Sequence, residues 1–153
     1  MRLNYWDLNN QLLWSPRASF SLDPNWEKDV IFRAALGVYY QPPFYRELRD
    51  LNGVIHSDLK AQQSIHLVLG SDYHFKAWNR PFKFISQLYY KDLKHLIHYE
   101  IDNVRIRYYA NNNAVGYAAG VDLKVNGEFV KGVDSWISMS VMQTREDITD
   151  DYY

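Results

Sequence analysis

The amino-acid sequence predicts an all-β fold, arranged as an antiparallel up-and-down meander. Three observations support this prediction: apolar and polar residues alternate over several long segments, these segments are rich in β-branched and aromatic residues, and helical spacing fits none of them better. Of the 153 residues, 47% are hydrophobic and 23% are charged, as in a folded protein of about one domain.

The first two strands are expected in the N-terminal part of the chain. In the first, over 14–22, apolar residues alternate with serines and Arg17. In the second, over 30–41, every residue of one parity is apolar, namely Val30, Phe32, Ala34, Leu36, Val38 and Tyr40.

Four more strands are expected in the rest of the chain. The segment over 64–76 alternates with two exceptions, Val68 and Ser71, and the segment over 82–91 alternates around Ile85 and Ser86. The clearest pattern lies over 114–126, and a shorter one over 136–144. These segments are longer than the usual strand of about 5–6 residues.

The connections between these strands alternate in length. Residues 23–29, 77–81 and 127–135 are short and rich in turn-forming residues, whereas 42–63 and 92–113 are long and carry aromatics, arginines and histidines. If successive strands are antiparallel, all short turns lie at one end of the sheet and all long loops at the other. Transmembrane β-barrels of the outer membrane share this asymmetry.

Aromatic residues near the strand ends support the same interpretation. Tyr40, Phe75, Phe82 and Tyr90 lie at positions where a membrane barrel carries its interfacial aromatic girdles. The fold class is therefore interpreted as an incomplete segment of a large transmembrane β-barrel. A soluble β-sandwich, whose strands also alternate, is the alternative.

Four motifs occur in a fixed order along the chain: SPRASF at 15–20, YYQPPFYREL at 39–48, DLKAQQS at 58–64 and GYAAGVD at 116–122. In this order and spacing they resemble barrel segments of TonB-dependent outer-membrane receptors. Ala61 stands where that family usually has Pro, and Asp122 stands where Glu is common. The resemblance covers nearly all of residues 1–153 and implies about six or seven strands of the barrel, without plug or closing strands.

This resemblance implies a function and a location. Receptors of this type are barrels of about 22 strands closed by a plug domain. They take up a scarce nutrient such as an iron-siderophore, cobalamin or an oligosaccharide, energised through the TonB system. The implied location is the outer membrane of a Gram-negative bacterium. The implied partners are lipid, the plug of the same full-length chain, TonB acting through that plug, and a small-molecule or oligosaccharide ligand.

Two sets of candidate site residues follow. The polar parity of the strands is expected to face the lumen or the plug, opposite the lipid-facing Leu36, Leu67, Val121 and Leu123; simple solvation of its charges is the alternative. The long loop after 41 offers aromatics and arginines that could bind ligand, or that could serve loop packing alone. The lumen-facing set is Arg33, Gln41, Asp72, Lys83 and Lys124, and the ligand-binding set is Phe44, Tyr45, Arg46, Glu47 and Arg49.

The sequence also argues against several function classes. The net charge of -1 argues against a nucleic-acid partner, and the absence of cysteine removes thiol nucleophiles and thiolate metal sites. No catalytic constellation is found, so a non-enzyme without catalytic residues is expected. No cofactor is expected. No metal is expected either, because His66 and His74 lie about 27 Å apart on an extended strand, and because the spacing of His95 and His98 points them to opposite faces on a strand, although to one face on a helix.

The acidic segment over 145–153 is interpreted as a solvated charge run rather than a strand. Two other functions stay open. One is a soluble or secreted carbohydrate-binding β-sandwich, in which exposed Trp and Tyr would stack on sugar rings. The other is an outer-membrane barrel enzyme or adhesin.

Overall fold

The computed structural model describes residues 1–149, which form β-strands and connecting turns and loops without a helix. Consequently, no helix of suitable length and hydropathy for crossing a membrane occurs in this part of the chain. The strands are β1 (Arg2–Trp6), β2 (Gln11–Ser15), β3 (Arg17–Leu22), β4 (Asp29–Gln41), β5 (Gln62–Ala77), β6 (Arg80–Leu96), β7 (Tyr99–Asp102), β8 (Arg105–Tyr108), β9 (Ala114–Val130) and β10 (Val133–Ile148).

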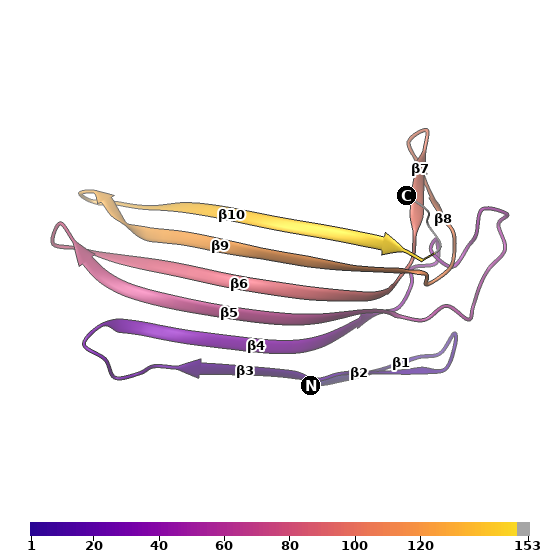
Figure 1. Ribbon diagram of the computed structural model, residues 1–153, viewed down its shortest axis with the longest axis horizontal. Coiled ribbons are helices and arrows are strands. Elements are labelled where there is room, and N and C mark those ends of the chain that lie inside the picture. The colour runs from indigo at the N-terminus through magenta and orange to yellow at the C-terminus, as the bar shows by residue number, and fades with distance from the viewer. Residues whose placement is uncertain (150–153) are drawn as a thin grey trace.

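Six of these strands form one antiparallel sheet in the order β3-β4-β5-β6-β9-β10 (Figure 1). Each strand pairs with the next along the chain, apart from the β7–β8 hairpin inserted between β6 and β9. The predicted all-β antiparallel meander is therefore confirmed. Beyond it, β1 pairs with β2 and β7 pairs with β8 in two small sheets that the sequence analysis did not predict.

Several strand boundaries differ from the prediction. The strand expected over 14–22 is interrupted at Pro16, which has no N–H to donate, although its carbonyl oxygen accepts a hydrogen bond from Val38 N at 2.9 Å. β6 continues to Leu96 and β9 to Val130.

The interpretation of 145–153 as a charge run outside the sheet is wrong for its first part. β10 includes Arg145 to Ile148, and its register with β9 continues to the pair Ile148↔Ala114. The backbone N–H and C=O groups of β10 can pair with β9 whether the side chains are polar or apolar. The strand therefore continues into the acidic residues. Asp150 and Asp151, which belong to the same predicted run, lie outside the described residues.

The two ends of the sheet differ as the connection lengths predict. β5 and β6 are joined by Trp78 and Asn79, with φ of 52° and 60°, and β9 and β10 are joined by a turn containing Gly132 with φ of 80°. Such left-handed residues match the twist of a tight hairpin. These turns lie together at one end, called the turn end, and the long connections lie at the opposite, loop end (Figure 1).

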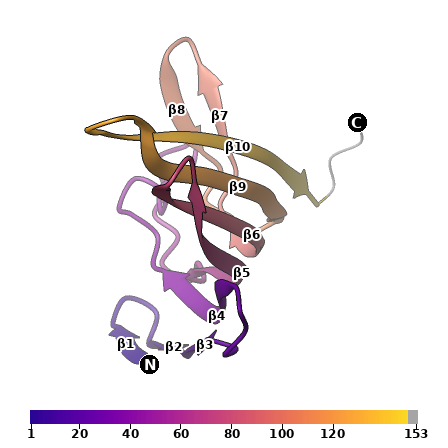
Figure 2. The ribbon, with the colours of Figure 1, turned by 90° about the vertical axis from the view of Figure 1, so that its left-hand side faces the viewer.

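The sheet is a single layer. Among the described residues, the strands in contact are the hydrogen-bonded neighbours and the pair β2 and β4. Viewed from its end, the twisted sheet shows no second sheet packed against it (Figure 2). Both of its faces are therefore uncovered by other strands of residues 1–149.

The strand register defines these two faces. One row of partners crosses all six strands and is entirely apolar: Phe20, Ala34, Leu69, Leu88, Val121 and Val141. We call this side the apolar face; it also carries Leu36, Leu67 and Leu123. The opposite side, the polar face, carries the alternate residues, including Asp72, Ile85, Lys124 and Ser138 in one row.

Apolar side chains are exposed on the apolar face of the sheet and buried among the loops. On the apolar face, Phe20 is 64% exposed, Leu88 52% and Val141 63%. A hydrophobic core forms instead at the loop end, from Leu48, Leu59, Ile97 and Ala110, with Trp6 and Tyr108 packed against it.

Candidate functional site

The polar face contains an ion-pair network centred on Asp72. The Asp72 side chain is 3% exposed, and its carboxylate pairs with Arg33 from β4 and with Lys83 from β6, whose Nζ lies 2.7 Å away. Two cations share one carboxylate, so the network keeps an excess of positive charge. A shallow hollow of about 440 Å³ adjoins Arg33 and is lined partly by small residues, including Ser19, Ser21, Ala35 and Gly70.

All five residues predicted to face the lumen share this face. Arg33, Asp72 and Lys83 form the network, and Lys124 lies with its Nζ 5.0 Å from the centre of the Trp136 ring. Gln41 lies apart from them, at the loop end of β4, opposite Gln62. The structure thus brings together three of the five residues.

Tyrosine rings lie on glycine backbone at two places of the polar face. A Cβ atom at Gly37 would lie 2.8 Å from Cε2 of Tyr39, and one at Gly120 would lie 2.5 Å from the hydroxyl oxygen of Tyr89. The Tyr39 ring also contacts the Arg17 guanidinium and stacks on His66, both at 4.3 Å. Only glycine permits so close an approach.

The loops are tied together at the loop end by side-chain hydrogen bonds. The Asn112 carboxamide accepts from Lys60 N at 2.7 Å and donates to the carbonyl oxygens of Lys60 and His95. Gln11 of β2 accepts from Ala61 N at 3.1 Å. These bonds join four parts of the chain, at residues 11, 60–61, 95 and 112, so the loop end forms one ordered unit over the hydrophobic core.

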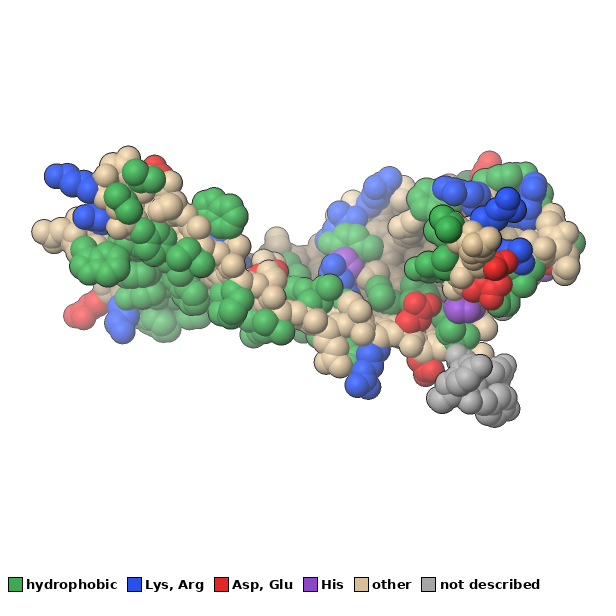
Figure 3. Space-filling view, turned by 90° about the horizontal axis from the view of Figure 1, so that it is seen from above, with side chains coloured by type: hydrophobic (Ala, Val, Ile, Leu, Met, Phe, Trp, Pro, Cys, Tyr) green, Lys and Arg blue, Asp and Glu red, His purple; other side chains and the backbone are tan. Residues whose placement is uncertain are grey.

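This unit contains a cavity of about 430 Å³, which we call the loop cleft. One wall comes from the segment after β4 and the other from β8. At this end of the molecule, Lys and Arg side chains gather with Asp and Glu, whereas hydrophobic side chains dominate the turn end (Figure 3). The cleft is lined by Tyr45, Arg46, Arg49, Asp50, Leu51, Ile106, Arg107 and Tyr108.

Three of the five residues predicted to bind ligand line the loop cleft: Tyr45, Arg46 and Arg49. Phe44 and Glu47 do not line it. The Glu47 carboxylate accepts a hydrogen bond from Phe44 N at 2.8 Å and one from Gln62 Nε2 at 3.4 Å, and so holds the turn in place.

The second wall was missed by the sequence analysis, which treated 92–113 as one long loop. Arg107 and Tyr108 belong to the four-residue strand β8, which pairs with β7 across a turn at Asn103 and Val104. The alternation of Arg105, Ile106, Arg107 and Tyr108 was the available signal.

The charges of the loop cleft are unequally paired. The Asp50 carboxylate accepts hydrogen bonds from His56 Nε2 at 3.2 Å and from the backbone N–H groups of Asn52 and Val54 at 2.9 and 2.8 Å. The His56 hydrogen bond, together with these backbone groups, lowers the pKa of Asp50 below its usual value, against a smaller opposing effect of burial. Asp50 thus braces its own loop.

The arginines of the cleft have fewer partners. Arg107 pairs with Asp102 at 2.7 Å. Arg49 donates to the Tyr45 hydroxyl at 3.1 Å, with its guanidinium 5.5 Å from the centre of that ring. Among the described residues, neither Arg46 nor Arg49 forms an ion pair with a carboxylate.

The histidines serve other contacts. His98 stacks on Tyr109 with ring centres 4.9 Å apart, and the Tyr109 hydroxyl donates to Glu100 at 2.7 Å, an interaction that raises the pKa of Tyr109. Within residues 1–149, no group of three His, Asp or Glu side chains is placed to hold a metal ion.

Comparisons with known proteins leave the family open. No family model matches the chain, and no curated protein or solved structure is significantly similar to it.

Proposed function

We propose that this chain is part of the wall and extracellular loops of a TonB-dependent transporter in the outer membrane of a Gram-negative bacterium, and that the whole protein actively takes up a scarce nutrient. The observation that carries the proposal is the exposed apolar face, which continues across all six strands of a single-layer sheet. In water, an apolar surface of this extent is unfavourable, whereas in a bilayer it is solvated by lipid.

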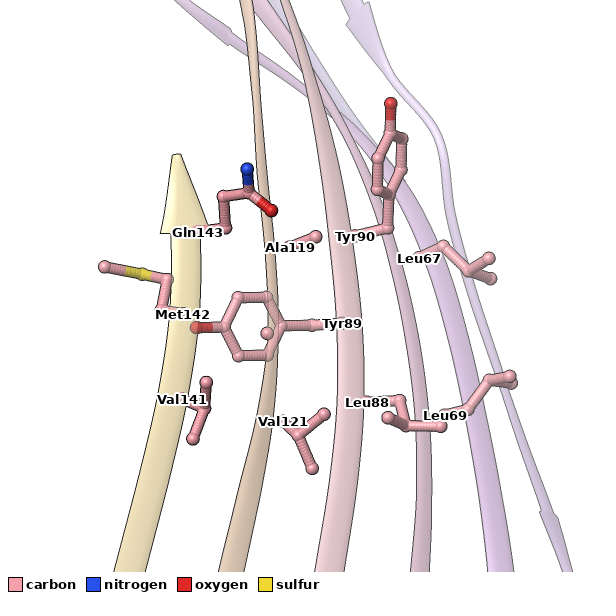
Figure 4. Close-up of a pocket in the computed structure, with 11 residues that line it drawn as sticks. Leu67, Leu69, Leu88, Tyr89, Tyr90, Ala119, Val121, Val141, Met142 and Gln143 are labelled. Atoms are coloured by element: carbon pink, nitrogen blue, oxygen red, sulfur yellow. The ribbon is translucent and has the colours of Figure 1, made fainter. Parts of the chain in front are cut away.

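Two aromatic bands border this face. At the turn end, Phe75 stacks on Phe82 with ring centres 5.6 Å apart, and at the loop end Tyr90 stacks on Tyr117 at 6.1 Å. Phe82 and Tyr90 lie on the same strand, separated by about 26 Å of extended backbone. Between the bands, aliphatic side chains project from neighbouring strands, as Leu69, Leu88, Val121 and Val141 do in Figure 4.

The polar face and the sheet edges support the same proposal. In a barrel wall the polar face lines the lumen, where the network of Arg33, Asp72 and Lys83 is hydrated or meets the plug. Among residues 1–149, the outer edges of β3 and β10 have no partner strand. In hydrocarbon such edges must be paired, so the proposal requires further strands of the same barrel. The assignment to the TonB-dependent class rests on the four sequence motifs.

The test is the behaviour of the 153-residue chain with and without lipid. In detergent-free buffer we expect aggregation, and with phosphatidylcholine vesicles we expect a β-rich, vesicle-bound protein by sedimentation and circular dichroism. Replacing Leu67, Leu69 and Leu88 by Ser should reduce vesicle binding strongly. The matched control, with Ser at His66, Val68 and Gln87 of the polar face, should bind vesicles as the parent chain does.

A monodisperse, soluble monomer that unfolds cooperatively in detergent-free buffer would overturn the proposal. The soluble carbohydrate-binding β-module would then replace it.

A further inference from the structure

The loop cleft has a chemical character that narrows the class of ligand. Its lining combines three guanidinium groups, two tyrosines and the apolar side chains of Leu51 and Ile106. Among residues 1–149, Asp50 is the one carboxylate in the lining, and its oxygens already accept three hydrogen bonds from its own loop. Asp50 and the Asp102 partner of Arg107 offset only part of the charge of the three arginines, so the cleft keeps an excess of positive charge.

The second carboxylate of this loop is also engaged elsewhere. Glu47 does not line the cleft, and it accepts hydrogen bonds from Phe44 N and Gln62 Nε2. Arg46 and Arg49, which are three residues apart and both exposed, consequently keep their charge available to a ligand. Arginine recognises carboxylates through two parallel hydrogen bonds, which gives it geometric selectivity as well as charge.

The cleft is also held in place before any ligand arrives. On one side, Asp50 N donates to Val54 O at 3.0 Å and His56 N donates to Leu48 O at 2.7 Å, closing a tight turn. On the other side, Tyr108 ends a paired strand and packs against the core that contains Leu48. Both walls share one hydrophobic core, so little conformational entropy is lost when a ligand binds.

We infer that the loop cleft binds a small organic anion with a flat ring, its carboxylates held by Arg46 and Arg49 and its ring lying against Tyr45 or Tyr108. The inference rests on the proposed function and deepens it: among nutrients of different charge, it selects an anionic ligand over a neutral oligosaccharide. Tyrosine rings supply the stacking surface and the arginines supply the charge selectivity.

The experiment is a calorimetric titration of the 153-residue chain in zwitterionic detergent micelles with phthalate, a benzene ring bearing two carboxylates. Phthalamide has the same ring without charge, and maltotriose represents neutral sugars. We expect phthalate to bind and the two neutral compounds not to bind. Arg46→Gln or Arg49→Gln should each weaken phthalate binding about tenfold, the size of one charge-assisted hydrogen-bonded contact.

The matched control is Arg105→Gln, which removes an equal charge from β8 at a position outside the cleft lining. It should change phthalate affinity less than about twofold, because an exposed charge outside the lining makes no hydrogen bond to the ligand and is screened by salt. Circular dichroism of each variant, identical to that of the parent chain, excludes unfolding as the cause.

Three results would overturn the inference: no heat of binding with phthalate, equal binding of phthalamide, or an equal loss of affinity in the Arg105→Gln variant. Binding of maltotriose alone would replace the anionic ligand by a sugar and leave the transporter proposal standing. The transporter proposal fails separately, if the chain is a monodisperse, soluble monomer in detergent-free buffer.

Discussion

At the loop end, Leu48 is 5% exposed and Ile97 is 6% exposed, whereas on the apolar face of the sheet Leu36 is 53% exposed and Leu67 is 44% exposed. The loop end also unites segments that are far apart in the sequence. The sheet joins mainly strands that are consecutive along the chain.

The difference teaches that the exposed side chains of the loop end suit water, whereas those of the apolar face suit a hydrocarbon environment. The loop end hides its apolar side chains and exposes arginines, as proteins in water do. In its central rows, the sheet carries the Arg33–Asp72–Lys83 network on one face and exposed apolar side chains on the other, an arrangement that hydrocarbon over the apolar face would stabilise. The comparison can be tested by substitutions that act on one region and spare the other.

The largest effect is expected on the apolar face, from Val121→Arg. If the apolar face contacts lipid as proposed, placing a guanidinium near its middle should lower the free energy of unfolding in phosphatidylcholine vesicles by about 2–4 kcal/mol, measured by urea titration. Lys124→Arg on the polar face is the control and should have almost no effect. Equal losses in both variants would show that the two faces meet the same solvent.

The next effect is expected in the core of the loop end, from Leu48→Ala. Removing this buried side chain should destabilise the loop unit by about 2–3 kcal/mol, because the side chain leaves a cavity against Leu59 and Ile97. Amide hydrogen exchange of residues 48–61 and 97–110 measures the loss.

Leu51→Ala, at a side chain that is 47% exposed in the same loop, is its control and should change exchange little. If both variants lose protection alike, the loop end has no hydrophobic core of its own.

A smaller, stabilising effect is expected in the β7–β8 turn. Val104 has a φ of 75° and is 93% exposed, so a β-branched residue adopts a left-handed conformation there with little packing in return. Val104→Gly should relieve about 1 kcal/mol of strain, measured as increased exchange protection across Tyr99–Asp102 and Arg105–Tyr108. Asn103→Gly should increase exchange protection less, since asparagine tolerates the left-handed conformation. A loss of protection in Val104→Gly would contradict the assignment of strain.

The smallest effect concerns pH and Asp50. Because hydrogen bonds lower the pKa of this carboxyl in the folded loop, its contribution to loop order is present above the usual carboxyl pKa and is lost as pH falls through the lower, folded-state pKa. The amide resonances of Asn52 and Val54 should shift over this acidic range, and Asp50→Asn should abolish the shift. A transition above the usual carboxyl pKa would contradict the direction.

The sequence was informative where the pattern is long and local. Alternation over nine to thirteen residues predicted the strands of the sheet, and parity placed Arg33 and Asp72 on the same face because the side-chain period of a strand is two. The ion pair itself needed the register between β4 and β5, which parity does not specify.

The sequence predicted only one of the two walls of the loop cleft. Aromatic and arginine content identified Tyr45 and Arg49, but their partner wall lies in a strand of four residues, whose alternation is too short to predict a strand by itself. The bridges made by Asn112 to Lys60 and His95 join distant segments, and no local pattern encodes them. Strand ends were misjudged where backbone pairing continued into charged residues, as in Arg145 to Ile148.

The alternation of short turns and long loops has a kinetic consequence. The β5–β6 and β9–β10 hairpins are each closed by two residues between the strands, whereas β4 and β5 are separated by residues 42–61. Closing the longer loop costs about 2 kcal/mol more chain entropy than closing a two-residue turn. We therefore expect these two hairpins to form within about 10 μs, as isolated hairpins do. The pairing of β6 with β9 then follows, after the β7–β8 segment between them has been brought together, so the sheet grows by addition of preformed hairpins rather than of single strands.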